Sequence, residues 1–211
     1  MKLPYKKALI LAPHTDDGEF GCGGTISRLI REGCEVMYVA FSDCKESVPD
    51  GFPKDILQSE MKAATAVLKI KPDHVKILDY KVRYFPSERQ RILEDLVKIN
   101  KEYNPDVVFT PSRQDVHQDH STITNECIRA FKSKSIYGYE LPWNNLNLPS
   151  NCIIKLEEED IKNKIMAIQM YKSQFGRTYS STEYQNSLAL TRGTRIGTNY
   201  AEAFDLIRII H

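Results

Sequence analysis

The sequence predicts a single α/β domain built around a mostly parallel sheet that helices cover on both faces. Short apolar runs alternate with segments of helical periodicity over the first two-thirds of the chain, which is the pattern of such a sheet. The chain has 211 residues, 41% of them hydrophobic, and this is enough for one domain with a sizeable core. Because no repeat or interdomain linker is visible, residues 1–211 are expected to form that one domain.

Four short apolar runs are the expected strands. They are Ala8–Ala12, Glu35–Phe41, Val75–Leu78 and Val107–Thr110. The first, second and fourth are almost wholly apolar, which is typical of parallel strands buried on both faces. Apolar residues recurring at helical spacing predict helices between and after these strands: Gly24–Glu32, Asp55–Leu68, Ser87–Asn100 and a helix from about Ser121 to Phe131.

The last third of the chain is less regular. It contains a strand-like run, Ile136–Leu141, and a helix within Glu157–Tyr171. A loop rich in glycine, arginine and threonine, Thr191–Thr198, precedes a final apolar stretch, Ala201–Ile210. Residues 43–54 are predicted to form a mobile loop at the carboxyl end of a strand, where doubly wound sheets bind ligands.

Charge and cysteine content exclude several classes of protein. A net charge of +1 gives no general attraction to nucleic acid or to anionic membranes. The five cysteines are odd in number and include no C-x-x-C pair, which favours a reducing compartment. No apolar stretch approaches the ~20 residues needed to cross a bilayer. We therefore expect a soluble cytoplasmic protein with no nucleic-acid partner and no membrane anchor.

Two polar clusters are the most informative feature of the chain. Pro13-His14-Thr15-Asp16-Asp17 and His117-Gln118-Asp119-His120 hold three of the five histidines, and each cluster follows a candidate strand. Imidazole and carboxylate are ligands that Zn²⁺ and similar metals favour. Clusters at the ends of neighbouring strands could meet at one ion, so the pattern predicts a metal-assisted hydrolase.

Such a site needs about three protein ligands, an open position for water and a carboxylate base that the metal does not occupy. The neighbouring side chains of Asp16 and Asp17 cannot point the same way, so one can bind the metal while the other faces the water. In the second cluster, one histidine can bind the metal while the other lies beside it, oriented by a carboxylate. The remaining histidines, His74 and His211, are expected at the surface.

The second cluster has a simpler explanation. A lone His-x-Asp-His occurs often enough by chance that it could be a capped helix start, although two such clusters after two buried strands favour a metal.

The glycines near the first cluster have an alternative explanation of their own. Gly21 and Gly23 after the first strand suggest a dinucleotide fingerprint. That pattern requires glycine or alanine at position 26, where this chain has Ile26, and acidic Asp43 would have to bind a ribose. Charged side chains also crowd the place of the pyrophosphate, so a nicotinamide cofactor is disfavoured.

The segment from Leu11 to Thr25, LAPHTDDGEFGCGGT, resembles the opening motif of the LmbE-like, or PIG-L, deacetylases: P/A-H-P-D-D-E followed by a glycine-rich helix start. The second cluster matches the family's H-x-D-H motif. Softer matches are Tyr171–Gln174, Arg192–Gly197 and Tyr200–Phe204. The resemblance spans nearly the whole chain and implies a Rossmann-like three-layer sandwich with a mostly parallel central sheet.

The resemblance also implies an activity and a metal site. Family members are Zn²⁺-dependent N-deacetylases that act mainly on N-acetylglucosaminyl conjugates and release acetate and a free amine. Zn²⁺ is therefore the expected cofactor, with Fe²⁺ or another divalent metal as an alternative. Position by position, the resemblance makes three residues the metal ligands: His14, Asp17 and His120. Relatives often form trimers or hexamers, so a homo-oligomer is expected.

The same comparison gives catalytic roles to three further residues. Asp16 becomes the general base, and His117 becomes a protonated group that stabilises the oxyanion or assists departure of the amine. Asp119 stabilises the positive charge of His117 and orients its ring. Two positions depart from the family motif: Thr15 replaces proline, and Gly18-Glu19 stands where an acid commonly follows the second aspartate. Neither change removes a ligand or the base, so we expect an active enzyme.

Substrate-binding residues are less certain from the sequence. A phosphate or carboxylate on the substrate would call for arginine, and the candidates are Arg83, Arg89, Arg192 and Arg195. We expect Arg89, Arg192 and Glu202 to bind substrate, although each could instead be a solvated charge or an ion-pair partner. Trp143 could stack on a pyranose face or lie in the core or at a subunit interface.

Two other functions fit parts of the pattern. Two histidines and one carboxylate are also the ligand set of non-haem Fe(II) oxygenases, although that function leaves Asp16 and His117 unexplained. A catalytically silent sugar-binding protein is a third possibility, which release of acetate would exclude.

Overall fold

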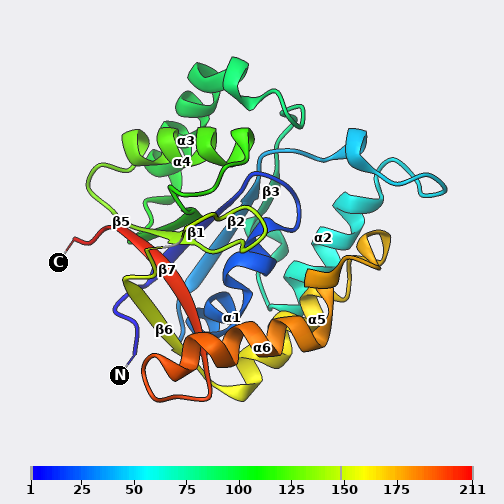
Figure 1. The fold of residues 1–211 in the computed structure, drawn as a ribbon. Coiled ribbons are helices and arrows are strands. Elements are labelled where there is room, and N and C mark those ends of the chain that lie inside the picture. The colour runs from blue at the N-terminus through cyan, green and yellow to red at the C-terminus, as the bar shows by residue number, and fades with distance from the viewer. Residues whose placement is uncertain (1, 148, 211) are drawn as a thin grey trace.

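The protein is built on one seven-stranded sheet with strand order β3-β2-β1-β4-β5-β7-β6 (Figure 1). The computed structural model describes residues 2–147 and 149–210. The strands are β1 Lys7–Ala12, β2 Glu35–Ala40, β3 Val75–Ile77, β4 Val107–Pro111, β5 Ser135–Tyr139, β6 Cys152–Leu156 and β7 Tyr200–Arg208. Strands β1 to β5 pair in parallel, and β7 pairs antiparallel with both β5 and β6. The predicted α/β fold with a mostly parallel sheet is confirmed.

Helices form the two outer layers. They are α1 Asp17–Arg31, α2 Ile56–Val67, α3 Arg89–Tyr103, α4 Gln118–Ala130, α5 Glu158–Ile168 and α6 Thr182–Thr194. Ala8 and Ile10 of β1 belong to the apolar cluster that includes the buried faces of α1, α2 and α5. Leu9 and Leu11 belong to the cluster shared with α3 and α4. Successive strand residues point to opposite faces, and both faces of β1 are covered, which explains why this strand is apolar from Ala8 to Ala12.

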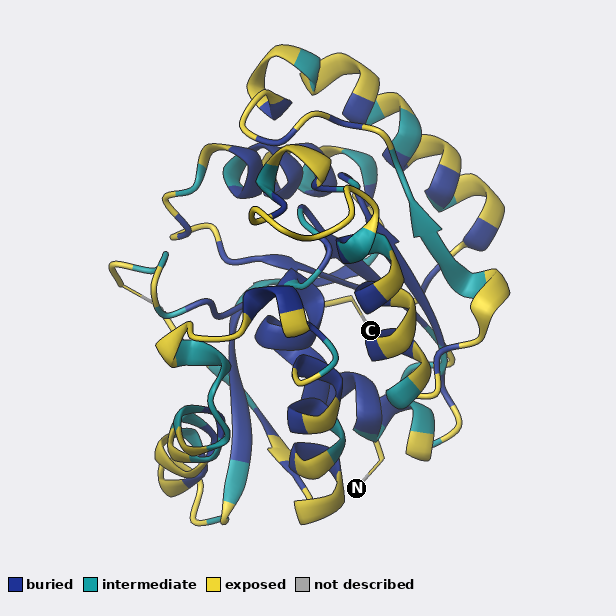
Figure 2. Cartoon of the chain, turned by 90° about the vertical axis from the view of Figure 1, so that its right-hand side faces the viewer, coloured by how far each residue is buried: buried dark blue, intermediate teal, exposed yellow. Residues whose placement is uncertain are grey.

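Burial follows these layers. The strands are largely buried, whereas the outward faces of the helices are exposed (Figure 2). In the described parts of the chain, we find no helix with the length and apolar character needed to cross a lipid bilayer.

The elements match the sequence predictions closely in the first two-thirds and less well afterwards. The first helix begins at Asp17 rather than Gly24, so the glycine cluster lies inside it. Strand β6 and helix α6 were not predicted. The predicted loop Thr191–Thr198 is partly wrong, because its first four residues are the last turn of α6. This helix has only a few buried residues, which explains why its sequence shows no clear apolar stripe.

Helix α1 approaches the sheet closely at its glycines. A Cβ atom on Gly21 would lie 2.2 Å from the Tyr139 ring, and one on Gly18 would lie 2.5 Å from the Tyr38 ring. Both distances are shorter than packing allows, so only glycine lets the start of α1 lie against β2 and β5 at this depth. This close approach brings the start of α1 to the carboxyl edge of the sheet.

A kink in α1 is stabilised by Glu202 from β7. Cys22 has non-helical dihedral angles (φ −148°, ψ 25°). The backbone N–H groups of Gly24 and Thr25 donate to the Glu202 carboxylate at 3.1 and 2.7 Å, and Lys164 Nζ lies 2.8 Å from the same group. Glu202 is 6% exposed. Its predicted role in substrate binding is therefore wrong, because both carboxylate oxygens already accept hydrogen bonds from the backbone of α1 or from Lys164.

Replacing Glu202 with Ala is expected to lower the free energy of unfolding by about 3–5 kcal/mol. The change leaves the buried Lys164 ammonium and two backbone N–H groups without their acceptor. Chemical denaturation monitored by circular dichroism measures this. The matched control is Glu94→Ala on the exposed side of α3, which should change stability by no more than about 0.5 kcal/mol. Equal effects of the two substitutions would contradict the structural role of Glu202.

Candidate metal centre

The two predicted clusters meet at the carboxyl edge of the sheet. Strands β1 and β4 are adjacent and parallel, so the segments that follow them leave the sheet side by side. His14 lies just after β1, and Asp17 is the first residue of α1. His117 is the N-cap of α4, and His120 lies in its first turn. The structure therefore brings together residues that are about a hundred positions apart in the sequence.

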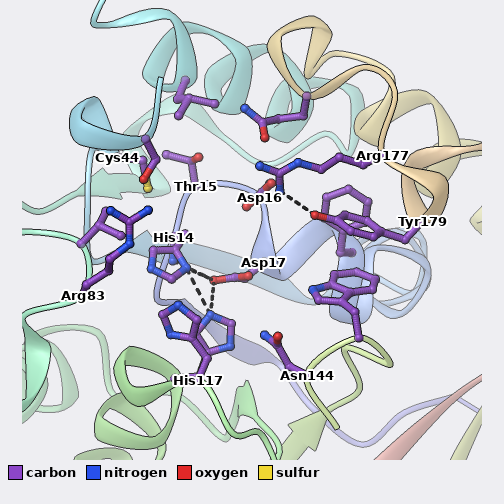
Figure 3. Close-up of a pocket in the computed structure, with 17 residues that line it drawn as sticks. His14, Thr15, Asp16, Asp17, Cys44, Arg83, His117, Asn144, Arg177 and Tyr179 are labelled. Atoms are coloured by element: carbon purple, nitrogen blue, oxygen red, sulfur yellow. Dashed lines mark hydrogen bonds and ion pairs between the residues drawn. The ribbon is translucent and has the colours of Figure 1, made fainter. Parts of the chain in front are cut away.

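Three donor atoms form a small triangle (Figure 3). His14 Nδ1 and His120 Nε2 are 3.1 Å apart, and each lies 3.2 Å from Asp17 Oδ2. Donors placed tetrahedrally at 2.0–2.1 Å from a zinc ion are separated by about 3.3–3.4 Å. The triangle matches one face of such a tetrahedron to within a few tenths of an ångström. His14, Asp17 and His120 could therefore hold a divalent metal such as Zn²⁺.

Two buried carboxylates orient the histidines of this triangle. Asp115 Oδ2 lies 2.8 Å from His120 Nδ1, and Asp119 Oδ2 lies 3.2 Å from His14 Nε2. A carboxylate accepts a hydrogen bond from the protonated ring nitrogen and thereby leaves the other nitrogen with its lone pair. His14 Nδ1 and His120 Nε2 are thus the free lone pairs, and they are the two atoms that face Asp17.

The electrostatics of this triangle favour a cation. Burial opposes charge on His14 and His120, yet the attraction of Asp17 and the carboxylates behind them raises the pKa of His14 to about 9 and that of His120 to about 10. Burial would raise the pKa of Asp17, but the facing imidazoles hold it well below its usual range. Positive charge is favoured at the point where the three donors meet, and a divalent ion would supply it.

His117 lies beside the triangle. The imidazoles of His14, His117 and His120 offer nitrogens within 4.8 Å of one another, so a three-histidine site is an alternative. However, His117 Nδ1 accepts a hydrogen bond from the Asp119 backbone N–H at 3.2 Å. A neutral imidazole that accepts at Nδ1 carries its proton on Nε2. His117 then has no lone pair left for a metal, which favours Asp17 as the third ligand.

Two predicted features of His117 need correction. The Asp119 carboxylate does not orient His117; it contacts His14 and accepts hydrogen bonds from the backbone N–H groups of Arg83 and Phe85 at 2.6 and 3.2 Å. Burial and the charge of the neighbouring His120 and His14 lower the pKa of His117. The neutral imidazole is therefore favoured over the predicted protonated form.

Asp16 is the N-cap residue of α1 and lines the cavity next to Asp17. Burial and the negative charge of Asp17 raise the pKa of Asp16 to about 6, against the opposing effect of His14 and Arg177. A carboxylate with a raised pKa is a stronger base than one in water, and this is the character that a general base needs. The structure thus gives the two neighbouring aspartates different environments: Asp17 faces the histidines, and Asp16 faces the cavity.

Glu19, whose role the sequence left open, supports the turn that carries these aspartates. It is fully buried and accepts hydrogen bonds from the hydroxyls of Tyr38 and Tyr171. Both hydroxyls also lie within hydrogen-bond distance of the Thr15 carbonyl, at 3.0 and 2.7 Å. Burial raises the pKa of Glu19 to about 8. The network holds the Thr15 backbone beside Asp16.

The cavity above the triangle has a volume of about 270 Å³. Segments after β1, β2, β3, β4 and β5 line it, together with the loop between α5 and α6. The predicted loop at residues 43–54 contributes Cys44 and Ser47. Trp143 lines the cavity, and its indole stacks on Tyr179 with ring centroids 3.9 Å apart. The volume is close to the lower end of small-molecule sites, about 300–1,000 Å³, so one sugar ring and part of its substituent could enter.

Two arginines predicted to bind substrate lie elsewhere. Arg89 Nη2 forms an ion pair with the buried Glu126 at 2.7 Å, and Arg192 Nε donates to Glu140 at 2.9 Å. Neither residue lines the cavity, so both predictions are wrong. Their carboxylate partners are distant in sequence and were invisible to motif analysis.

Four further residues that line the cavity were not predicted: Asn144, Gln174, Arg177 and Tyr179. Arg83, which was one of several candidates, does line it. The only signal for the missed group was the resemblance of Tyr171–Gln174 to the family. The connection from α5 to α6 has no periodicity that would point it toward the sheet edge.

The comparison with known families agrees with this geometry. The sequence model of PIG-L, described as GlcNAc-PI de-N-acetylase, matches residues 9–131, which include both clusters. The chain belongs to the PIG-L family. This PIG-L family member is 25% identical to the diacetylchitobiose deacetylase of Thermococcus kodakarensis over 231 residues, covering 96% of this chain and 83% of that enzyme. The predicted family is confirmed.

A solved structure of the family shares the whole fold. The N,N'-diacetylchitobiose deacetylase from Pyrococcus horikoshii, complexed with its inhibitor MPG, is 26% identical to this PIG-L family member. The two structures have a TM-score of 0.80 over 96% of this chain and 84% of that one.

The same fold also carries a different chemistry. GalB, the 4-carboxy-2-hydroxymuconate hydratase of Pseudomonas putida KT2440, has a TM-score of 0.79, with 18% identity over 98% of both chains. This likeness shows the fold alone. The activity of the present PIG-L family member must therefore be argued from its site.

Replacing Asp119 with Asn is expected to weaken metal binding by about 10–100-fold, because His14 loses the carboxylate that fixes its tautomer. Competition with a chromophoric chelator measures the affinity for Zn²⁺. The matched control is Asp73→Asn, at an exposed position, which should leave the affinity unchanged. If Asp119→Asn bound Zn²⁺ as tightly as the unmodified protein, Asp119 would not position His14.

Proposed function

We propose that this protein is a metal-dependent amidohydrolase that removes the acetyl group from an N-acetylated amino sugar, giving acetate and a free amine. The observation that carries the proposal is the triangle of His14 Nδ1, Asp17 Oδ2 and His120 Nε2, with a second carboxylate, Asp16, beside it. Three donors and a separate base are what metal-assisted hydrolysis requires. Membership of the PIG-L family supports deacetylation as the form of that hydrolysis.

The chemistry divides between the metal and the side chains. A divalent ion held by the triangle would polarise the acetyl carbonyl and lower the pKa of the attacking water. Asp16 accepts a proton from that water as its oxygen bonds to the acetyl carbon. When the carbon–nitrogen bond breaks, Asp16 returns the proton to the departing nitrogen, so that a free amine leaves. The second proton of the water stays on the new carboxyl group, which loses it to solvent to give acetate. Each turnover thus consumes one water and restores Asp16 to its ionised form.

His117 contributes a hydrogen bond in this scheme. Its Nδ1 is occupied by the Asp119 backbone N–H, so its proton lies on Nε2. A neutral Nε2–H can donate to the oxyanion that develops on the acetyl oxygen, and one such donor contributes about 3–4 kcal/mol in comparable sites. Asp119 is a positioning residue: its carboxylate holds His14, and its backbone holds His117.

The choice of metal and substrate rests on ligand chemistry and relatives. Two imidazoles and one carboxylate in tetrahedral arrangement suit Zn²⁺, and Fe²⁺ is the alternative. Relatives named as diacetylchitobiose deacetylases support an N-acetylglucosaminyl substrate. An Fe(II) oxygenase would give Asp16 no role, and a silent sugar-binding protein would give neither Asp16 nor the triangle a role. The single-domain organisation, homo-oligomer and cytoplasmic location stay predictions.

Replacing Asp16 with Asn should abolish acetate release while bound metal is retained. The amide keeps the shape of the side chain but cannot accept the water proton, and loss of a general base costs about 10²–10⁴-fold in rate. Acetate release from N,N'-diacetylchitobiose and elemental analysis of the same preparation measure the two properties. Turnover at the unmodified rate would exclude Asp16 as the base.

Removing the metal should abolish acetate release, and added Zn²⁺ should restore it. Within the site, His120→Ala should lose the metal, because it removes one of the three donors of the triangle. His117→Ala should keep the metal and lose turnover, since His117 has no lone pair to offer. Elemental analysis of both variants separates the two ligand sets: loss of metal in His117→Ala would favour the three-histidine site.

A further inference from the structure

We propose that Glu60 is a positioning residue that keeps the carbonyl oxygen of the Gln174 amide directed into the cavity, where this oxygen accepts a hydrogen bond from an O–H or N–H group of the amino sugar. This inference rests on the proposed deacetylase function and adds one substrate contact to it. Glu60 lies on α2, and Gln174 lies in the connection from α5 to α6. Figure 1 shows this connection beside α2.

Glu60 is a buried carboxylate that the deacetylation scheme does not use. Both of its oxygens accept from one residue: Ser173 donates its backbone N–H to Oε1 at 2.8 Å and its hydroxyl to Oε2 at 2.6 Å. Within the described residues, no lysine, arginine or histidine forms an ion pair with Glu60. A buried charge without a basic partner costs stability, so the contact is better explained by what it holds in place.

The donors and acceptors of this contact fix the direction of the Gln174 amide. A carboxylate only accepts hydrogen bonds, and a serine hydroxyl has a single hydrogen. Since that hydrogen goes to Glu60, Ser173 Oγ can only accept from the neighbouring amide, and Gln174 Nε2 lies 3.1 Å from it. The amide nitrogen is therefore held at Ser173, and the carbonyl oxygen is left for another donor.

The carbonyl oxygen of Gln174 is the atom available to a ligand. The side chain lines the cavity that also contains His14, Asp16 and Asp17. In the parts of the chain that the structure describes, Gln174 Oε1 accepts no hydrogen bond, and it is not among the polar atoms that are enclosed without a partner. An O–H or N–H group of a substrate in the cavity would complete its hydrogen bonding.

The segment that carries Gln174 is fixed relative to the metal centre. The Tyr171 hydroxyl lies 2.7 Å from the Thr15 carbonyl, next to Asp16. The backbone N–H of Gln174 in turn donates to the Tyr171 carbonyl at 3.0 Å. The amide therefore keeps a set position relative to the proposed base, which is what a contact that orients the substrate requires.

Glu60→Gln should reverse this chain of hydrogen bonds without removing it. The new amide oxygen can still accept the Ser173 backbone N–H, but the new NH₂ group then faces Ser173 Oγ and donates to it. The serine hydrogen is released toward Gln174, whose amide must turn and present its carbonyl oxygen to Ser173. The NH₂ group of Gln174 would then face the cavity, so the substrate donor would meet another donor.

The experiment measures acetate release from N,N'-diacetylchitobiose by the metal-loaded protein. Glu60→Gln should raise KM by about 3–10-fold, which corresponds to the loss of one hydrogen bond between neutral groups. It should leave kcat within about twofold, because the contact is equally strong before and during the reaction. Gln174→Met removes the acceptor at similar volume and should raise KM by a similar factor.

A double-mutant cycle separates positioning from a general effect on the fold. If Glu60 acts through the Gln174 amide, Glu60→Gln should have no further effect on KM once Gln174→Met is present. The matched control is Glu94→Gln, at an exposed position on α3, which makes the same change of net charge and should leave KM unchanged. The proposal is overturned if Glu60→Gln leaves KM unchanged, or if the effects of Glu60→Gln and Gln174→Met multiply.

Trp143 reports whether the connection from α5 to α6 has moved. It is the single tryptophan of the chain, and its indole stacks on Tyr179 of that connection. Glu60→Gln should leave the emission maximum and the acrylamide quenching of Trp143 unchanged. It should not lower the midpoint of chemical denaturation, since a neutral amide replaces a buried charge. A shifted emission together with a raised KM would show that the connection has moved, which contradicts an effect through the amide alone.

A failure of the proposed function gives a different result. If no acetate is released from N,N'-diacetylchitobiose, deacetylation of this sugar is wrong, and binding then decides the present inference. Isothermal titration of the same sugar into metal-loaded Asp16→Asn protein measures Kd with and without Glu60→Gln and Gln174→Met. Binding that Glu60→Gln weakens only while Gln174 is intact supports the contact. Binding that is independent of Glu60, or no binding, excludes it.

Discussion

The hydrogen bonds behind His14 and His120 are the constraint on which the rest of the site depends. A neutral imidazole carries its proton on one of its two nitrogens. The hydrogen bond that one nitrogen donates therefore decides that the other nitrogen offers the lone pair. Buried Asp119 and Asp115 make that decision for His14 and His120, respectively. The free lone pairs then face Asp17, where burial and negative charge together favour a cation. Without these two carboxylates, the same residues could form a cluster of ordinary hydrogen bonds.

The fold brings the segments after β1 and β4 and the start of α1 together at the carboxyl edge of the sheet. Parallel pairing of β1 and β4 places the segments after them side by side. Close contact of Gly18 and Gly21 with Tyr38 and Tyr139 brings the start of α1, and with it Asp17, to the same point. Glu202 completes the arrangement by accepting the backbone N–H groups freed at the kink of α1. Glu202, which was predicted to bind substrate, thus supports the helix that carries Asp17.

Family and fold constrain the chemistry to different degrees. Membership of the PIG-L family points to hydrolysis of an acetamide, whereas a hydratase with the same architecture shows that the sheet and helices permit other reactions. The discriminating feature is local: a second carboxylate, Asp16, lines the cavity beside the residues that could hold a metal.

The sequence by itself determined the parallel sheet, most of its helices and both histidine-aspartate clusters. Apolar periodicity and local motifs depend only on residues that are close together in the sequence, so they can be read without the structure. It could not show that Asp119 holds His14 rather than His117, since a carboxylate's partner depends on distances across β1 and β4. Nor could it separate Arg83, which lines the cavity, from Arg89, which is paired with Glu126. Only the tertiary structure decided these points, because charged groups pair through space, and partners such as Glu126 and Asp205 are remote in the chain.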